Sequence, residues 1–119
     1  MTPLLIKSFP ASAAVAGYRI VVLGAGGAAQ AAAATADVVG VSDSLGADAG
    51  GMLDVLMVGL GEVTCGGNVA AGKPLVADAQ GRAVQAVAGA GVRIVGYALA
   101  AGAVGDVIPL HIAPGYYSA

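Results

Sequence analysis

The sequence predicts an all-β fold, a compact single-domain β-barrel or β-sandwich of about eight short strands. Two observations carry this prediction. Short β-branched and aliphatic runs are separated by turn residues at a spacing of roughly 8–12 residues, which is typical of small sandwiches and barrels. In addition, blocks near the start recur in the same order 54 to 56 residues later. We therefore expect an internal duplication of about 55 residues.

In the first half, strands are expected at residues 18–23, 38–42 and 53–64, where Val, Ile and Leu gather between glycines. The stretch at 28–36 is almost entirely Ala, which is the best helix former. It contains no large apolar side chain, and nine residues are marginal for a helix without packing. We therefore interpret this stretch as extended.

In the second half, strands are expected at residues 74–77, 83–87, 92–97 and 104–112. The first two are joined by Asp78-Ala79-Gln80-Gly81, which has Asp first and Gly last, as a type I turn prefers. This segment is therefore a predicted hairpin.

The matched blocks place the two repeat copies at approximately 15–59 and 69–115, within one β domain at 13–119. Eight glycines at or near matched positions are candidate structural residues of turns and bulges. They are Gly17, Gly27, Gly40, Gly51, Gly72, Gly81, Gly96 and Gly105.

The segment 1–12 precedes the repeats and is either an extended N-terminal arm or a first strand. It combines the only Phe of the chain with a cluster of large aliphatic residues, and its prolines disfavour a helix. Such side chains outside the repeated core are candidates for contact with a partner. The candidate contact residues are Pro3, Leu4, Leu5, Ile6 and Phe9.

Composition excludes several functions. Five basic residues and a net charge of −2 leave no electrostatic footprint for nucleic acid. One Cys and one His cannot build a zinc site, and a single Cys forms no internal disulfide. We expect no membrane span and no signal peptide, because no stretch approaches about 20 strongly apolar residues and the start lacks a basic region. We expect a soluble chain in a reducing compartment, without metal or cofactor.

One motif favours an alternative. Residues 19–29 run from a strand into Gly24-Ala25-Gly26-Gly27-Ala28-Ala29, and Asp43 follows a second Val-rich run. In a dinucleotide-binding fold such glycines approach a pyrophosphate and the acid holds a ribose. A nucleotide-binding enzyme fragment is therefore an alternative function. The matching place in the second copy is the acidic turn at 78–81, which favours a hairpin turn at 24–27 instead.

Other reactive residues stand alone. His111 lies between two aliphatic residues, and Cys65 has no neighbouring base in the sequence, so both are interpreted as structural. We expect no catalytic residues. The seven carboxylates are spread singly and are expected at turns and edges.

Ordered stretches of the chain resemble the small capsid decoration, or cement, proteins of tailed bacteriophages. They include Ala71-Gly72-Lys73-Pro74-Leu75-Val76-Ala77-Asp78 and Val95-Gly96-Tyr97-Ala98-Leu99, and in full they lie at 16–22, 39–42, 54–63, 71–84 and 95–110. The resemblance implies a β-rich domain on the outside of a phage head, with no enzyme activity and no cofactor. Its partners would be the major capsid protein and copies of itself, as trimers at threefold positions or dimers at twofold positions, of which the trimer is slightly favoured.

From this resemblance we expect a structural virion protein that bridges major capsid subunits on the head exterior, and that is found in the host cytoplasm before assembly. The composition of Ala, Gly and Val leaves a further alternative open, a bacterial shell or fibre subunit that assembles with itself.

Overall fold

A computed structural model describes residues 5–24 and 26–117 of the chain, and it contains nine strands and no helix in these residues. The strands are β1 (Leu5–Pro10), β2 (Ile20–Gly24), β3 (Gly27–Gln30), β4 (Val38–Ser42), β5 (Met52–Thr64), β6 (Pro74–Ala77), β7 (Ala83–Gln85), β8 (Arg93–Ala98) and β9 (Val107–Tyr116). The predicted all-β class is confirmed. The strands number nine rather than about eight, and two of them, β5 and β9, are long.

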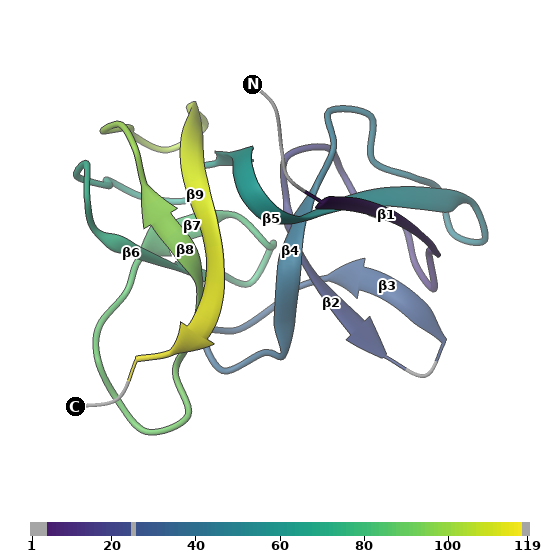
Figure 1. Ribbon diagram of the computed structural model, residues 1–119, viewed down its shortest axis with the longest axis horizontal. Coiled ribbons are helices and arrows are strands. Elements are labelled where there is room, and N and C mark those ends of the chain that lie inside the picture. Colours follow the sequence, from purple (N-terminus) through teal and green to yellow (C-terminus); the bar gives the residue numbers. More distant parts are fainter. Residues whose placement is uncertain (1–4, 25, 118–119) are drawn as a thin grey trace.

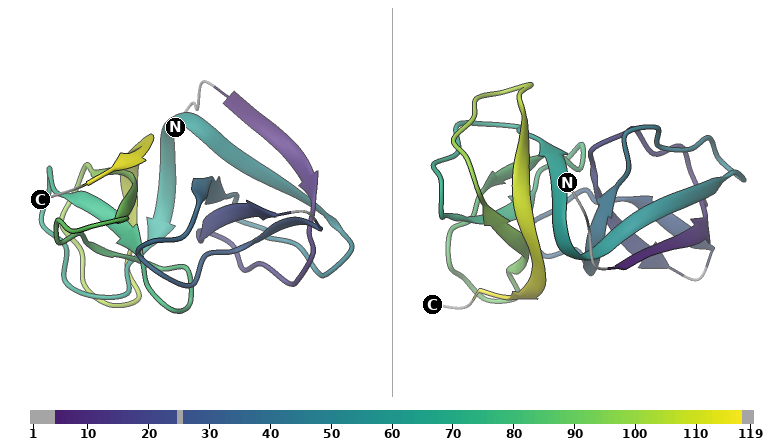
Figure 2. Two further views of the ribbon diagram at one scale, coloured as in Figure 1. Left: turned by 90° about the horizontal axis from the view of Figure 1, so that it is seen from below. Right: turned by 45° about the horizontal axis from the view of Figure 1, so that its top comes forward.

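All strand pairs are antiparallel and form one sheet in the order β3-β2-β4-β5-β9-β8-β6-β7, with β1 paired to β5. This path ends at β3 and β7 and does not close into a barrel. The 13-residue β5 connects the two halves: its first half pairs with β1 and β4, and its second half with β9. It bends strongly between these halves (Figures 1 and 2), and Gly59 has a φ of 96° at that point.

The sheet order shows the duplication. We define unit 1 as residues 5–58 and unit 2 as residues 59–116. Strands β2, β3, β4 and the first half of β5 correspond to β6, β7, β8 and β9. The pairing of β1 with β5 has the same register as the pairing of the second half of β5 with β9: Pro10 lies opposite Met52, and Thr64 opposite Val107. The duplicated unit thus has five strands and starts at β1.

Hydrogen bonds outside the strands repeat as well. The backbone N–H of Ala16 donates to Oε1 of Gln30 at 3.1 Å, and that of Ala70 to Oε1 of Gln85, also at 3.1 Å. Isolated bridges recur in the same way, Val15 with Ala47 and Val69 with Gly102, and Ala11 with Ala28 and Cys65 with Ala83. The last two bridges are parallel and bring the first strand of each unit to its third. The internal duplication is confirmed at the level of individual bonds.

The N-terminal segment is extended, as expected, and residues 5–10 belong to unit 1 as its first strand. Its counterpart in unit 2 is the second half of β5, at about 60–64. In this register Ile6 and Phe9 correspond to Leu60 and Val63, but no residue is identical, so the sequence blocks did not include this strand in the repeat.

The Ala-rich stretch at 28–36 is not helical: it begins within β3 and continues into a turn. Ala28 and Ala31 are buried, Ala28 against the core of unit 1. Small side chains suit this place because a single parallel bridge joins Ala28 to Ala11 there.

Two hydrophobic clusters form the core. The smaller cluster fills unit 1 and contains Ala11, Val15, Val21, Ala28, Leu53 and Val55. The larger cluster fills unit 2, with Val63, Cys65, Leu75, Val95 and Leu110 among its members, and extends between the units to Ile20, Val38 and Val41. Several outward residues of unit 1 are therefore part of the core of unit 2, and the two units pack as one domain.

Backbone bonds also join the units. The N–H of Ile20 donates to the carbonyl of Gly81 at 2.7 Å, and the N–H of Thr64 donates to that of Tyr18 at 2.9 Å. The guanidinium of Arg93 lies 2.8 Å from the carboxylate of Asp37 and 4.7 Å from the ring centre of Tyr116.

Candidate functional site

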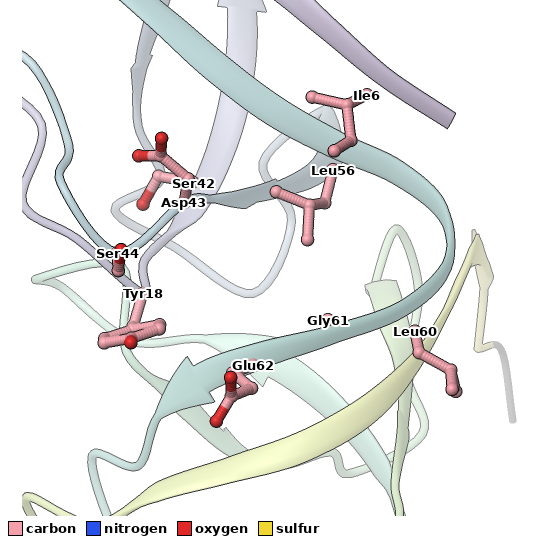
Figure 3. A pocket seen from close by; sticks show the side chains of 9 residues that line it. All are labelled: Ile6, Tyr18, Ser42, Asp43, Ser44, Leu56, Leu60, Gly61 and Glu62. Carbon is pink, nitrogen blue, oxygen red and sulfur yellow. The ribbon is translucent and has the colours of Figure 1, made fainter. Parts of the chain in front are cut away.

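A hollow of about 250 Å³ lies at the junction of the two units, beside the bend of β5 (Figure 3). Figure 3 shows aliphatic side chains on one side of it and polar groups on the other. Its lining residues are Ile6, Tyr18, Ser42, Asp43, Ser44, Leu56, Leu60, Gly61 and Glu62.

The polar groups of the hollow are held by the backbone around them. The buried Ser42 hydroxyl accepts a hydrogen bond from the Arg19 N–H at 2.9 Å and donates one to the Ala16 carbonyl at 2.8 Å. The Asp43 carboxylate accepts bonds from the N–H groups of Leu45 and Gly46. These groups fix the loop after β4 and so have structural partners already.

The titratable side chains that line the hollow are Tyr18, Asp43 and Glu62. Its two carboxylates, Asp43 and Glu62, are not joined by a histidine, a thiol or a cation among its lining residues. No group of three or more His, Cys, Asp or Glu side chains in the described residues is placed to hold a metal ion.

The lone reactive residues are placed as the sequence interpretation expected. Cys65 is fully buried, and burial together with the nearby Asp106 charge raises the pKa of its thiol, so the nucleophilic thiolate is disfavoured. His111 is exposed on β9, opposite Leu60 on β5 and Tyr97 on β8. Several carboxylates serve turns, since Asp78 accepts from the N–H groups two and four residues later.

In the Gly-rich motif, Gly24 ends β2 and lies opposite Gly27, which begins β3, so the motif links the two strands of a hairpin. A dinucleotide site of this type needs a helix whose N-terminus faces the phosphate, and here a strand follows the turn. Asp43, the acid of that alternative, binds its own loop. The fold therefore corrects the alternative of a nucleotide-binding fragment, whose motif is a hairpin turn.

The candidate contact residues have different environments. Pro3 and Leu4 lie outside the described residues, and Leu5 begins β1 with its backbone opposite Val58. Ile6 is 51% exposed and lines the hollow. Phe9 is half-buried and packs on the core of unit 1, with the Lys7 ammonium 5.7 Å from its ring centre. Of the described side chains in this set, Ile6 is the one a partner can reach most readily.

The eight candidate glycines have backbone surroundings of two kinds. Gly27, Gly72, Gly81 and Gly105 have positive φ angles. Gly40 and Gly96 occupy equivalent places where a Cβ would meet a backbone carbonyl of the next strand, that of Leu56 or of His111. Gly17 lies against the carbonyl of Ser44, and Gly51 leaves 3.1 Å between its Cβ position and the Asp48 carbonyl oxygen.

The structure shows a second candidate binding surface, which the sequence analysis did not identify. It is the outward side of the sheet in unit 2, here called the unit 2 face, and it includes Leu60, Glu62, Pro74, Tyr97, Leu99, Pro109 and His111. Tyr97 and Leu99 are 41% and 49% exposed. An alignment of the two units position by position was the signal that could have found it, because two of these apolar residues replace aspartates.

The described strands thus define a β protein made of two tandem five-stranded units. No helix in the described part of the chain is long and apolar enough to cross a membrane. No protein-family model matches the sequence, and no curated protein matches it.

Among solved structures, the chain is similar to the head fiber gp8.5 N base in bacteriophage phi29. The TM-score is 0.70 at 23% sequence identity, and the likeness covers 92% of this chain and 93% of that chain. At this identity the likeness shows a shared fold across nearly the whole of both chains.

Proposed function

We propose that this chain is a structural protein of a phage virion, located on the exterior of the head. One observation carries the proposal: a protein described as the base of a phage head fiber shares its fold over 92% of the chain. The ordered Gly- and Ala-rich stretches of the chain also resemble decoration proteins, a likeness taken from the sequence alone. Both likenesses point to a protein of the phage head. Fold alone does not define function, so the site must agree.

The described surfaces agree with a binding role. The hollow beside β5 is lined by Ile6, Leu56 and Leu60, and its polar groups are largely occupied by their own loop. We propose that the chain has no enzyme activity, takes no cofactor and binds the major capsid protein through exposed apolar side chains. If several copies are joined in an oligomer, simultaneous binding to identical sites on one shell gives high total affinity from weak contacts.

The finer proposal is that the chain bridges neighbouring capsid subunits as a homotrimer, and that the N-terminal segment contributes to this contact. Ile6 supports the second part, because it is half-exposed at the junction of the units. A fibre subunit is a second candidate, favoured by the likeness of the fold to the base of the phi29 head fiber. In that role the chain would attach to the head without stabilising it.

The test is to mix the purified chain with phage heads assembled without it, and to measure occupancy by sedimentation and the temperature at which heads release DNA. We expect saturable binding to the head exterior. Binding with a raised release temperature supports a stabilising decoration protein, and binding without a change supports the fibre base. Absence of binding to heads from its own phage contradicts the proposed function.

A matched pair of variants tests the N-terminal contact. Ile6→Lys places a charge at the junction hollow, and Leu45→Lys places the same charge at a side chain that is 86% exposed in the loop after β4. We expect Ile6→Lys to weaken head binding at least tenfold and Leu45→Lys to leave it unchanged. Equal affinities would remove Ile6 from the contact.

A further inference from the structure

The junction hollow beside the bend of β5 combines an apolar wall with acidic groups (Figure 3). On the apolar wall, Ile6 is 51% and Leu60 37% exposed, so a partner can reach both side chains. The volume of about 250 Å³ lies below the range of roughly 300–1,000 Å³ that is usual for small-molecule sites. A hollow of this size suits one long side chain of a partner.

The acidic groups of the hollow have no cation beside them. Asp43 and Glu62 line it, whereas no lysine, arginine or histidine is among its lining residues. The two ion pairs in the described part of the chain use other carboxylates, those of Asp78 and Asp37. The hollow therefore presents two carboxylates without a counter-charge, and in charge it complements a basic group.

The fold uses only part of this acidic lining. The Asp43 carboxylate accepts hydrogen bonds from the N–H groups of Leu45 and Gly46, and both bonds end on the same oxygen, Oδ1. Oδ2 of Asp43 and the carboxylate of the exposed Glu62 form no hydrogen bond or ion pair with the described residues. Acceptor oxygens thus remain at the hollow for a donor from outside the chain.

Tyr18 provides a second, independent observation. Among the described residues it is the only one other than glycine with a positive φ, 57°, a conformation that costs a bulky residue free energy. The equivalent residue of unit 2 is Gly72, at a φ of 83°. Strained residues gather at binding sites, where the surrounding structure holds a functional side chain in place. Unit 1 thus keeps an aromatic side chain on the hollow where unit 2 has none.

The duplication shows that the polar lining is not required by the strand framework. The N–H of Ser42 donates to the Arg19 carbonyl at 2.8 Å, as the N–H of Ala98 does to that of Lys73 at 2.9 Å, so Ser42 and Ala98 are equivalent. The next residue is Asp43 in unit 1 and a leucine in unit 2. Unit 2 therefore forms the same strands with apolar side chains at these two positions.

We propose that the junction hollow binds a basic side chain, lysine or arginine, of the protein that this chain contacts on the phage head. The methylene groups of that side chain pack on Ile6, Leu56 and Leu60, as the stems of basic residues do on apolar surfaces. Its charged end binds the free carboxylate oxygens and the ring of Tyr18, because carboxylates and aromatic rings both attract cations. The inference rests on the proposed function for the identity of the partner and adds the chemistry that this partner presents.

The first experiment needs no phage heads and uses n-butylammonium, which has the stem and the charge of a lysine side chain. NMR chemical shifts of the purified chain are followed during titration at constant ionic strength, with n-butanol as the uncharged control. We expect saturable shifts at Ile6, Tyr18, Gly61 and Glu62, and at least fivefold weaker binding of n-butanol. Equal binding of the two probes, or no saturable shift at these residues, overturns the proposal.

Two variants identify the groups that bind the charge. Glu62→Gln removes one carboxylate at nearly constant shape, and Asp48→Asn is its control at an exposed acid of the loop after β4. Tyr18→Gly installs the residue that unit 2 has at this position. We expect Glu62→Gln and Tyr18→Gly each to bind n-butylammonium at least threefold more weakly, and Asp48→Asn to bind it unchanged. Thermal melting verifies folding, and a folded Glu62→Gln variant that binds like the control contradicts the proposal.

The second experiment measures head binding of the same proteins at rising salt concentration. We expect Glu62→Gln to bind heads at least fivefold more weakly at low salt, and the difference to shrink as salt screens charges beyond about 10 Å at 0.1 M. If heads bind the natural chain and Glu62→Gln equally, the inference is wrong while the proposed function stands. If no form binds heads and n-butylammonium still occupies the hollow, the proposed function fails and the preference of the hollow for basic groups stands.

Discussion

Unit 1 and unit 2 share five strands, their register and many loop hydrogen bonds, yet they differ in what their outward sides meet. Part of the outward side of unit 1 belongs to the larger core, through Ile20, Val38 and Val41, whereas Ile6 at its edge is 51% exposed. The unit 2 face is open and exposes Tyr97 and Leu60. The comparison teaches that the strand framework is fixed by the inner face, whereas residue type on the outer face follows what lies against it.

Single positions show the same dependence. Lys7 on β1 is exposed, and its counterpart on β5 is Gly61, which lies between the units. A Cβ on Gly61 would come within 2.9 Å of Cδ1 of Ile112 and 3.1 Å of Cγ2 of Val41. One copy of this position therefore accommodates a long charged side chain, and the other has no room for a methyl group without movement.

The largest effects are expected where the two units are the same. Gly40→Ala and Gly96→Ala each place a Cβ against a backbone carbonyl of the neighbouring strand, that of Leu56 or of His111. Backbone of a paired strand cannot move aside cheaply, so we expect each variant to lose about 3 kcal/mol or more of unfolding free energy. Urea denaturation measures the loss.

Gly115→Ala is the control, because no atom lies within 4 Å of its Cβ position. We expect a change within about 0.5 kcal/mol for it. If only one of Gly40→Ala and Gly96→Ala were destabilising, the two units would not depend on the same close approach of strands.

The next effect separates the two units. Val41→Lys buries a charge in the core between them, and Tyr97→Lys changes the equivalent exposed position of unit 2. We expect Val41→Lys to cost about 3 kcal/mol or more and Tyr97→Lys to stay within about 0.5 kcal/mol. Chemical denaturation at low protein concentration is the measurement, since association then contributes least. Equal losses would contradict the burial difference.

The fold could be predicted because its signals are local. Val- and Ile-rich runs, turn residues and the order of the repeated blocks indicated the strands of both units. The first strand of each unit escaped detection. Its two copies, at Leu5–Pro10 and Leu60–Thr64, are related by backbone register with the following strands, and their side chains have diverged with their surroundings. The register between distant strands depends on both strands, so it cannot be predicted from either segment alone.

The unit 2 face could not be predicted for a related reason. Exposure of Tyr97 depends on how the two units pack, and Val41, at the same position of the repeat, is buried. The N-terminal contact residues were chosen for size and apolar character. That reasoning did not separate Ile6, which is half-exposed, from Phe9, which packs on the core of unit 1.

A smaller effect concerns the loop before β2 in unit 1 and before β6 in unit 2. Tyr18 has a φ of 57° and the equivalent Gly72 a φ of 83°, both in the left-handed region. Gly72→Ala meets no atom within 4 Å, so its cost is conformational, and we expect a loss of about 1 kcal/mol. Thermal or urea denaturation against Gly115→Ala measures it. A stabilised Gly72→Ala variant would show that this loop has a different conformation in solution.

The smallest effect near neutral pH involves Cys65 of unit 2 and its counterpart Ala11 in unit 1, which form equivalent parallel bridges. Burial, then the Asp106 charge, raises the pKa of the Cys65 thiol in the folded chain. The unfolded chain therefore releases the thiol proton first. Stability from the neutral thiol is fully present below the ordinary cysteine pKa of about 8.5 and is lost as pH rises through the folded value. We expect the natural chain to lose unfolding free energy above that pH more steeply than Cys65→Ala.

A second variant moves the thiol to unit 1, by adding Ala11→Cys to the Cys65→Ala chain. The thiol then lies beside Gly51, the uncharged counterpart of Asp106. We therefore expect this variant to lose less unfolding free energy at alkaline pH than the natural chain. Urea denaturation at a series of pH values gives both slopes, and identical slopes for the natural chain and Cys65→Ala would show that Cys65 does not titrate differently on folding.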